Sequence, residues 1–262
     1  MATNSAANKV RAEGEAWRIW DHYGFSHPSG LPLVELAASR NLKIRTGGLP
    51  GARARLVRVG DSGIIRLRDE DIYTGAARFA ISHEMGHWAL HKESQGFVCD
   101  AQDLRDYRKS PQEAEANIFA AELLMPKQFV APLLRRKGVS MHAAQAMAEE
   151  FNVSLTSASI RMMNLSRDTC VLVFSKNRQV QWWVSSTDAF GIWLGSKQPL
   201  SIDSAAYHLG DADRGSFDVE EDVPFAAWFP NSPRSGDPAT SEQSCYLRAA
   251  GGVLTLLAID AE

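Results

Sequence analysis

Residues 81–91 read ISHEMGHWALH and contain two histidines, His83 and His87, four positions apart. On a helix, side chains at i and i+4 share one face, so both imidazoles can bind a single metal ion. Glu84 directly follows the first histidine and can act on a water molecule bound to that ion. The pattern H-E-x-x-H therefore predicts a zinc site with Glu84 as the general base.

A hydrolytic zinc site also needs a third protein ligand and an open position for water. His91 continues the four-residue spacing, but it lies about 12 Å along a helix axis from His83, and we interpret it as a helix-end histidine favoured by the helix dipole. Glu113, in the stretch EAEANIF, is followed at i+4 by Asn117, which can orient a ligand from outside the metal's own shell. Glu113 is the favoured third ligand and Glu115 is the alternative.

A second helix is predicted over SPQEAEANIFAAELLMP, residues 110–126. Ser110 suits the N-cap, Pro111 suits the first helical position, and Pro126 ends the run. The spacing Ser110-x-x-Glu113 is also that of a capping box, in which Glu113 would close the start of the helix instead of binding metal. The sequence leaves both interpretations open.

The periodicity of the rest of the chain predicts an α+β protein. Residues 52–70 alternate around Gly60 and Gly63 and predict a β-hairpin with arginines outward, at the edge of a sheet. The loop after the motif helix offers Tyr107 and Arg108 as candidates for stabilising an oxyanion. We expect helices over 12–24, over 31–42 and from Asp71 through the motif, and three short helices within 127–165. We expect strands in 169–175, 180–186 and 245–260.

Composition indicates a globular protein whose net charge does not favour binding to nucleic acid or lipid. The 262 residues are 45% hydrophobic and 23% charged, with a net charge of −3. The N-terminus lacks an apolar targeting segment, no long apolar run predicts a membrane span, and the three cysteines show no C-x-x-C spacing. We expect a cytoplasmic protein with reduced thiols and no membrane contact.

The blocks RFAISHEMGHWALH and EAEANIFAAELLMP, in this order, resemble the ImmA/IrrE family of bacterial and phage zinc metallopeptidases. The resemblance covers roughly residues 15–165. It implies a thermolysin-like core that binds Zn²⁺ through His83, His87 and Glu113, and a helix-turn-helix-like bundle. It also implies an endopeptidase that cleaves a partner helix-turn-helix transcriptional repressor and so derepresses stress, DNA-damage or mobile-element genes.

The IrrE branch of this family also carries a C-terminal sensor-like domain that resembles GAF, and this chain has a tail of domain size. Residues 166–262 hold 13 acidic and 7 basic side chains, unlike the slightly basic remainder. We therefore expect a zinc metallopeptidase domain over 1–126, a helix-turn-helix-like bundle over 127–166, and a strand-rich, GAF-like α/β domain over 167–262.

The segment MAEEFNVSLTSASIRMMNL, within the expected bundle, has the layout of a helix-turn-helix. A helix that reads DNA offers more base-reading and phosphate-binding side chains than Ser, Thr and the single Arg161. Partner docking or core packing is the favoured interpretation, and direct DNA binding is the less favoured one. The alternative function is accordingly a DNA-binding or sensory transcriptional regulator in which the zinc site is structural.

Overall fold

The structure of the chain is a computed structural model. It describes residues 7–49, 52–68, 72–92, 96–100, 110–186, 189, 192–209, 219–232 and 238–260.

The described chain contains both helices and strands, in two separate sheets, which confirms the predicted α+β class. In chain order they are α1 (Lys9–Tyr23), the 3-10 turn η1 (Pro28–Gly30), α2 (Leu33–Ala38), β1 (Leu42–Thr46), β2 (Ala52–Val59), β3 (Ser62–Leu67), α3 (Gly75–Leu90), β4 (Gly96–Asp100), α4 (Pro111–Leu124), α5 (Lys127–Lys137), α6 (Met141–Phe151), α7 (Leu155–Leu165), β5 (Cys170–Lys176), β6 (Gln179–Ser185), α8 (Ala205–His208), β7 (Val219–Val223), α9 (Phe225–Trp228), β8 (Thr240–Leu247) and β9 (Gly252–Ile259).

The chain forms two compact units. Unit 1 comprises Met1–Phe129 and Met147–Ser157, and unit 2 comprises Val130–Ala146 and Ala158–Glu262. The chain therefore passes from one unit to the other inside α5, α6 and α7. The three-part division at residues 126 and 166 stays a prediction.

Unit 1 contains a four-stranded sheet in the order β1-β3-β2-β4. Strands β2 and β3 form the predicted hairpin, but the prediction that it lies at the edge was wrong. β1 pairs with β3 in parallel and β4 pairs antiparallel with β2, so the hairpin supplies the two inner strands. The sequence pattern missed β1 because the helix predicted over 31–42 ends early: Asn41 adopts the left-handed conformation with φ of 60°, which a helix cannot continue.

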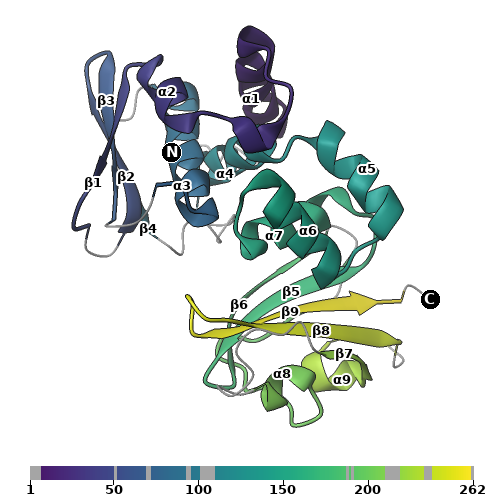
Figure 1. The fold of residues 1–262 in the computed structure, drawn as a ribbon. Helices are drawn as coiled ribbons and strands as arrows, with labels where there is room; N and C mark the ends of the chain where they lie inside the picture. The colour runs from purple at the N-terminus through teal and green to yellow at the C-terminus, as the bar shows by residue number, and fades with distance from the viewer. Residues whose placement is uncertain are drawn as a thin grey trace, which may run out of the picture. The chain divides into compact units, whose positions relative to one another are not determined.

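Helix α3 lies between this sheet and helix α4, with α1 packed beside α4 (Figure 1). Its start is fixed by Gly75, where an added Cβ would lie 2.3 Å from the backbone carbon of Val153. One turn further on, the buried Arg78 guanidinium donates hydrogen bonds to backbone carbonyls of Asn152, Leu31 and Pro28. These contacts hold the helix that carries the H-E-x-x-H motif.

Unit 2 is built on a five-stranded antiparallel sheet in the order β6-β5-β9-β8-β7. One face of the sheet packs against an apolar core that includes Trp228 and Phe229. The fully buried carboxylate of Glu242 on β8 accepts hydrogen bonds from Ala205 N, Ala206 N and Trp228 Nε1, which ties α8 and α9 to the sheet. None of the helices within the described ranges is long and apolar enough to cross a membrane.

Candidate metal centre

The H-E-x-x-H motif lies in the second half of α3, a helix that is buried on nearly all sides. His83, Glu84 and His87 each have a relative exposure of 0%. Thr74 caps the helix by accepting a hydrogen bond from Ala77 N, and His91 is the residue at its C-terminal cap. A polar cluster at such a position costs free energy unless its members pair or hold an ion.

Helix α4 brings the second half of the site close to α3, and Gly86 inside the motif is where the two helices approach. A Cβ added at Gly86 would lie 3.1 Å from both Ala116 Cα and Phe119 Cδ1. The absence of a side chain at this position therefore lets α4 lie against α3, so that Glu113 and Asn117 reach the histidines.

Ligand-type atoms of His83, His87 and Glu113 converge in one place. The two Nε2 atoms lie 3.0 Å apart, Glu113 Oε2 lies 3.1 Å from His83 Nε2, and Glu113 Oε1 lies 3.3 Å from His87 Nε2. Atoms bound about 2.0–2.1 Å from a tetrahedral zinc ion lie about 3.3–3.4 Å from one another. The three side chains therefore fit a zinc ion with little movement.

The electrostatics of the cluster also favour a cation. Burial alone would lower the pKa of His83, but its hydrogen bond to Glu113 and nearby carboxylate charges, including that of Glu84, raise it overall. Burial lowers the pKa of His87 to about 4, although the hydrogen bond with Glu113 acts in the opposite direction. Burial would raise the pKa of Glu113, but its hydrogen bonds to both histidines hold it well below the ordinary value. The cluster thus stabilises one positive charge, which a metal ion can supply in place of a proton.

Asn117 is the hydrogen-bond partner of the second ring nitrogen of His83, as the sequence predicted for a residue that orients a ligand. Its Oδ1 accepts a hydrogen bond from His83 Nδ1 over 2.9 Å, which leaves the lone pair of His83 on Nε2, facing Glu113. Ser110 caps α4 by accepting a hydrogen bond from Glu113 N over 3.2 Å. Ser110 thus caps the helix, while the Glu113 carboxylate faces the two histidines.

Glu115 and His91 lie beside this cluster and contact each other. His91 Nε2 lies 3.0 Å from Glu115 Oε2, and His91 Nδ1 lies 3.1 Å from His87 Nδ1. Sequence reasoning assigned His91 to the helix end and missed its contact with His87. The signal was the i+4 spacing itself, because His91 lies one further turn along the same face of α3. Tyr107 and Arg108 lie outside the described residues.

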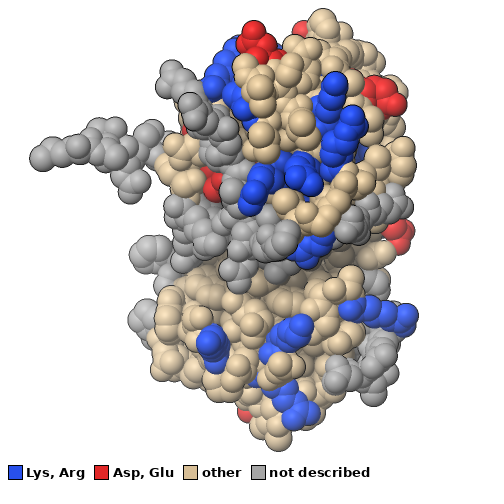
Figure 2. All heavy atoms as spheres, turned by 90° about the vertical axis from the view of Figure 1, so that its left-hand side faces the viewer, with Lys and Arg blue, Asp and Glu red and all other residues tan. Residues whose placement is uncertain are grey.

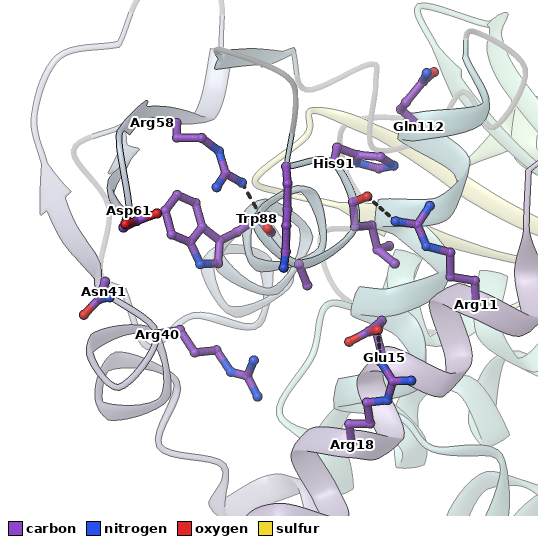
Figure 3. A pocket seen from close by; sticks show the side chains of 13 residues that line it. Arg11, Glu15, Arg18, Arg40, Asn41, Arg58, Asp61, Trp88, His91 and Gln112 are labelled. Carbon is purple, nitrogen blue, oxygen red and sulfur yellow. Dashed lines mark hydrogen bonds and ion pairs between the residues drawn. The ribbon is translucent and has the colours of Figure 1, made fainter.

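His91 also lines a basic pocket of about 1200 Å³. Five of its lining residues are cationic and two are acidic; the cations are Arg11, Arg18, Arg40, Arg58 and Lys92. Figure 3 shows Arg58 standing over the ring of Trp88, with the guanidinium carbon 3.7 Å from the ring centroid, and His91 and Arg11 across the pocket. Figure 2, turned toward the strands of unit 1, shows Lys and Arg gathered on that surface.

Residues 43–163 match the family model of the IrrE N-terminal-like domain, peptidase family M78. This stretch of the chain is similar to that domain. The match includes both motif blocks and confirms the resemblance inferred from them. A solved structure of a Mycobacterium tuberculosis transcriptional regulator shares the fold, with a TM-score of 0.59 at 14% identity over 95% of this chain and 88% of that one. A comparison with the curated proteins finds no significant match.

Proposed function

We propose that this IrrE N-terminal-like protein is a zinc-dependent endopeptidase of narrow specificity. The observation that carries the proposal is the convergence of His83, His87 and Glu113 within the buried helix pair, next to the buried Glu84. The donor set of two imidazoles and one carboxylate is that of a hydrolytic zinc site with one position open to water. A thermolysin-like arrangement of the core, as the family resemblance implies, is part of this proposal.

The residues of the chain have separate tasks in the reaction. Zinc held by the cluster would polarise the scissile carbonyl and acidify a water molecule. The Glu84 carboxylate takes the proton of the attacking water and delivers it to the leaving nitrogen, which is general base and then general acid catalysis. Asn117 Oδ1 holds His83 through its Nδ1 proton, so that Nε2 keeps its lone pair for the metal.

The substrate that we propose is one regulatory protein, a helix-turn-helix transcriptional repressor in the cytoplasm. The family resemblance supports this class of substrate, and the fold neighbour is itself a transcriptional regulator by name. The basic pocket, which His91 lines beside the metal cluster, offers a docking site for an acidic stretch of the repressor. Binding energy from such docking raises the effective concentration of one protein segment at the site and leaves other proteins uncut.

The second candidate, a DNA-binding or sensory regulator with a structural zinc site, is less well supported. Structural zinc sites have four protein ligands, and the cluster that forms among the described residues has three. Arg161 is the one charged residue in α7, Leu155–Leu165, and it is 5% exposed. A buried arginine cannot contact phosphates or bases. A GAF-like sensor in unit 2 stays a prediction.

The test compares cells that express the wild-type protein with cells that express Glu84→Gln, by mapping newly formed protein N-termini. We expect a few new N-termini, confined to one helix-turn-helix protein, only with the wild type. Metal analysis of both purified proteins should show about one zinc per chain, because Glu84 acts on water and not on the metal. The proposal is refuted if zinc is missing from the wild type, or if both proteins produce the same cleavage.

A further inference from the structure

The two histidines of the motif are held by different partners through their second ring nitrogens. His83 Nδ1 contacts the side-chain amide of Asn117, whereas His87 Nδ1 faces another imidazole, that of His91, over 3.1 Å. His91 in turn contacts the Glu115 carboxylate through Nε2 over 3.0 Å. A chain of three side chains therefore runs from the metal cluster to a carboxylate that does not belong to it.

The direction of these hydrogen bonds follows from the carboxylate at the end. A carboxylate only accepts, so His91 Nε2–H donates to Glu115 Oε2, and the lone pair of a neutral His91 then lies on Nδ1. His87 Nδ1–H donates to that lone pair, which leaves the lone pair of His87 on Nε2, toward Glu113 and the metal position. The carboxylate thus selects the one tautomer of His87 that can bind metal from this side.

Glu115 is itself fixed by the N-terminal helix. Its Oε1 accepts a hydrogen bond from Asn8 N, the residue that caps α1, over 2.8 Å, and Arg11 NH1 lies 3.9 Å from its Oε2. Arg11 also donates a hydrogen bond to Leu90 O at the end of α3. The orientation of the carboxylate is therefore set by α1 as well as by α4, and the side chain is only 10% exposed.

We propose that His91 and Glu115 are positioning residues of the metal centre. They hold the His87 ring in the metal-binding tautomer and orientation and raise its affinity for zinc without touching the ion. This inference rests on the proposed zinc site. It also assigns a role to Glu115, the alternative third ligand, and to His91, which the sequence indicated only as a helix-end histidine.

The expected effect is a weaker zinc site that still forms. Loss of a partner of a ligating histidine lowers metal affinity by about 10–100-fold. His91→Phe keeps a ring and removes both nitrogens, so it should fall in this range. Glu115→Ala should do the same, whereas Glu115→Gln, which keeps a side-chain oxygen that accepts from His91 Nε2–H, should lose less. Glu15→Gln is the matched control, because Glu15 lines the basic pocket together with His91 but pairs with Arg18 instead of the cluster.

The experiment uses the zinc-loaded full-length chain and two measurements that do not depend on proteolysis. Competition with a chromogenic chelator gives the zinc dissociation constant of each variant. NMR of protein with ¹⁵N-labelled histidine tests for a scalar coupling between the Nδ1 atoms of His87 and His91, which passes only through an N–H···N hydrogen bond. The coupling should be present in the wild type, Glu15→Gln and Glu115→Gln, and absent in His91→Phe.

The outcomes separate this inference from the proposed function. If the wild type binds no zinc, the proposed function fails. If the wild type binds zinc and His83→Ala abolishes binding, but His91→Phe and Glu115→Ala keep the wild-type affinity, the positioning role is wrong. Absence of the Nδ1–Nδ1 coupling in the zinc-loaded wild type also overturns it. Complete loss of zinc from a folded Glu115→Ala would instead make Glu115 a ligand, and this too would overturn the inference.

Discussion

Adding one methyl group inside the motif, by Gly86→Ala, should weaken zinc binding although no ligand changes. The new Cβ would lie 3.1 Å from both Ala116 Cα and Phe119 Cδ1 on α4. Carbon atoms in favourable contact lie about 3.5–4.0 Å apart. Helix α4 must therefore move away from α3 by several tenths of an ångström, and Glu113 moves with it.

The magnitude can be isolated by comparison with Gly14→Ala in the middle of α1. Gly14 is exposed and an added Cβ there meets nothing within 4 Å. Both substitutions gain about 0.8–1.0 kcal/mol of helix propensity, but only Gly86→Ala pays the overpacking cost of about 1–3 kcal/mol. The two variants should therefore differ in unfolding free energy by about 1–3 kcal/mol, with Gly14→Ala the more stable.

Zinc affinity responds more sharply than stability, because metal–ligand distances tolerate only about 0.2 Å of change. We expect Gly86→Ala to bind zinc about tenfold more weakly or worse, and Gly14→Ala to bind it as the wild type does. Urea unfolding and chelator competition measure the two quantities on the same samples. If Gly86→Ala is stabilised as much as Gly14→Ala and keeps wild-type zinc affinity, the close approach of the helices does not build the site.

Three further predictions concern the ligands, the pocket and unit 2. Glu113→Ala should remove most bound zinc from the purified protein, whereas Glu115→Ala should leave it largely in place; metal analysis giving the reverse pattern would exchange their roles. The double variant Arg40→Glu, Lys92→Glu should slow cleavage of the intact repressor without changing zinc content or cleavage of a short peptide spanning the cut site, and equal slowing of both substrates would argue against docking in the basic pocket. Burial raises the pKa of Glu242 above its ordinary value of 4.5 despite the hydrogen bonds that it accepts. The folded state therefore binds this proton more tightly, so stability should fall as the pH rises above about 4.5. Glu242→Gln should reduce that fall in urea unfolding at a series of pH values, and an unchanged profile would contradict the assignment.

Sequence patterns were sufficient to predict a structural feature where that feature depends on a single helix or hairpin. The motif helix, the cap at Ser110, and the paired strands β8 and β9 could all be predicted from local spacing. The failures occurred where distant segments meet. Strand β1 is short, carries exposed polar residues and follows a helix whose end depends on the backbone of Asn41. Its partner β3 could be recognised as an inner strand only once β1 was placed.

The different contacts of Glu113 and Glu115 show why the site could be only partly predicted. Two positions apart on a helix, the two carboxylates project about 200° apart, so one helix cannot present both to the same ion. Spacing therefore indicated that at most one of the two can be a ligand of the predicted zinc site, with Glu113 favoured and Glu115 the alternative. Whether Glu113 or Glu115 reaches the two motif histidines depends on the register of α4 against α3. In that register Ala116 and Phe119 lie close to Gly86. In this register Glu113 meets His83 and His87, while Glu115 meets His91 one turn further along α3. The close approach at Gly86 thus bears on both the proposed ligand Glu113 and the proposed positioning residue Glu115, which is why Gly86→Ala tests the assignment of both glutamates.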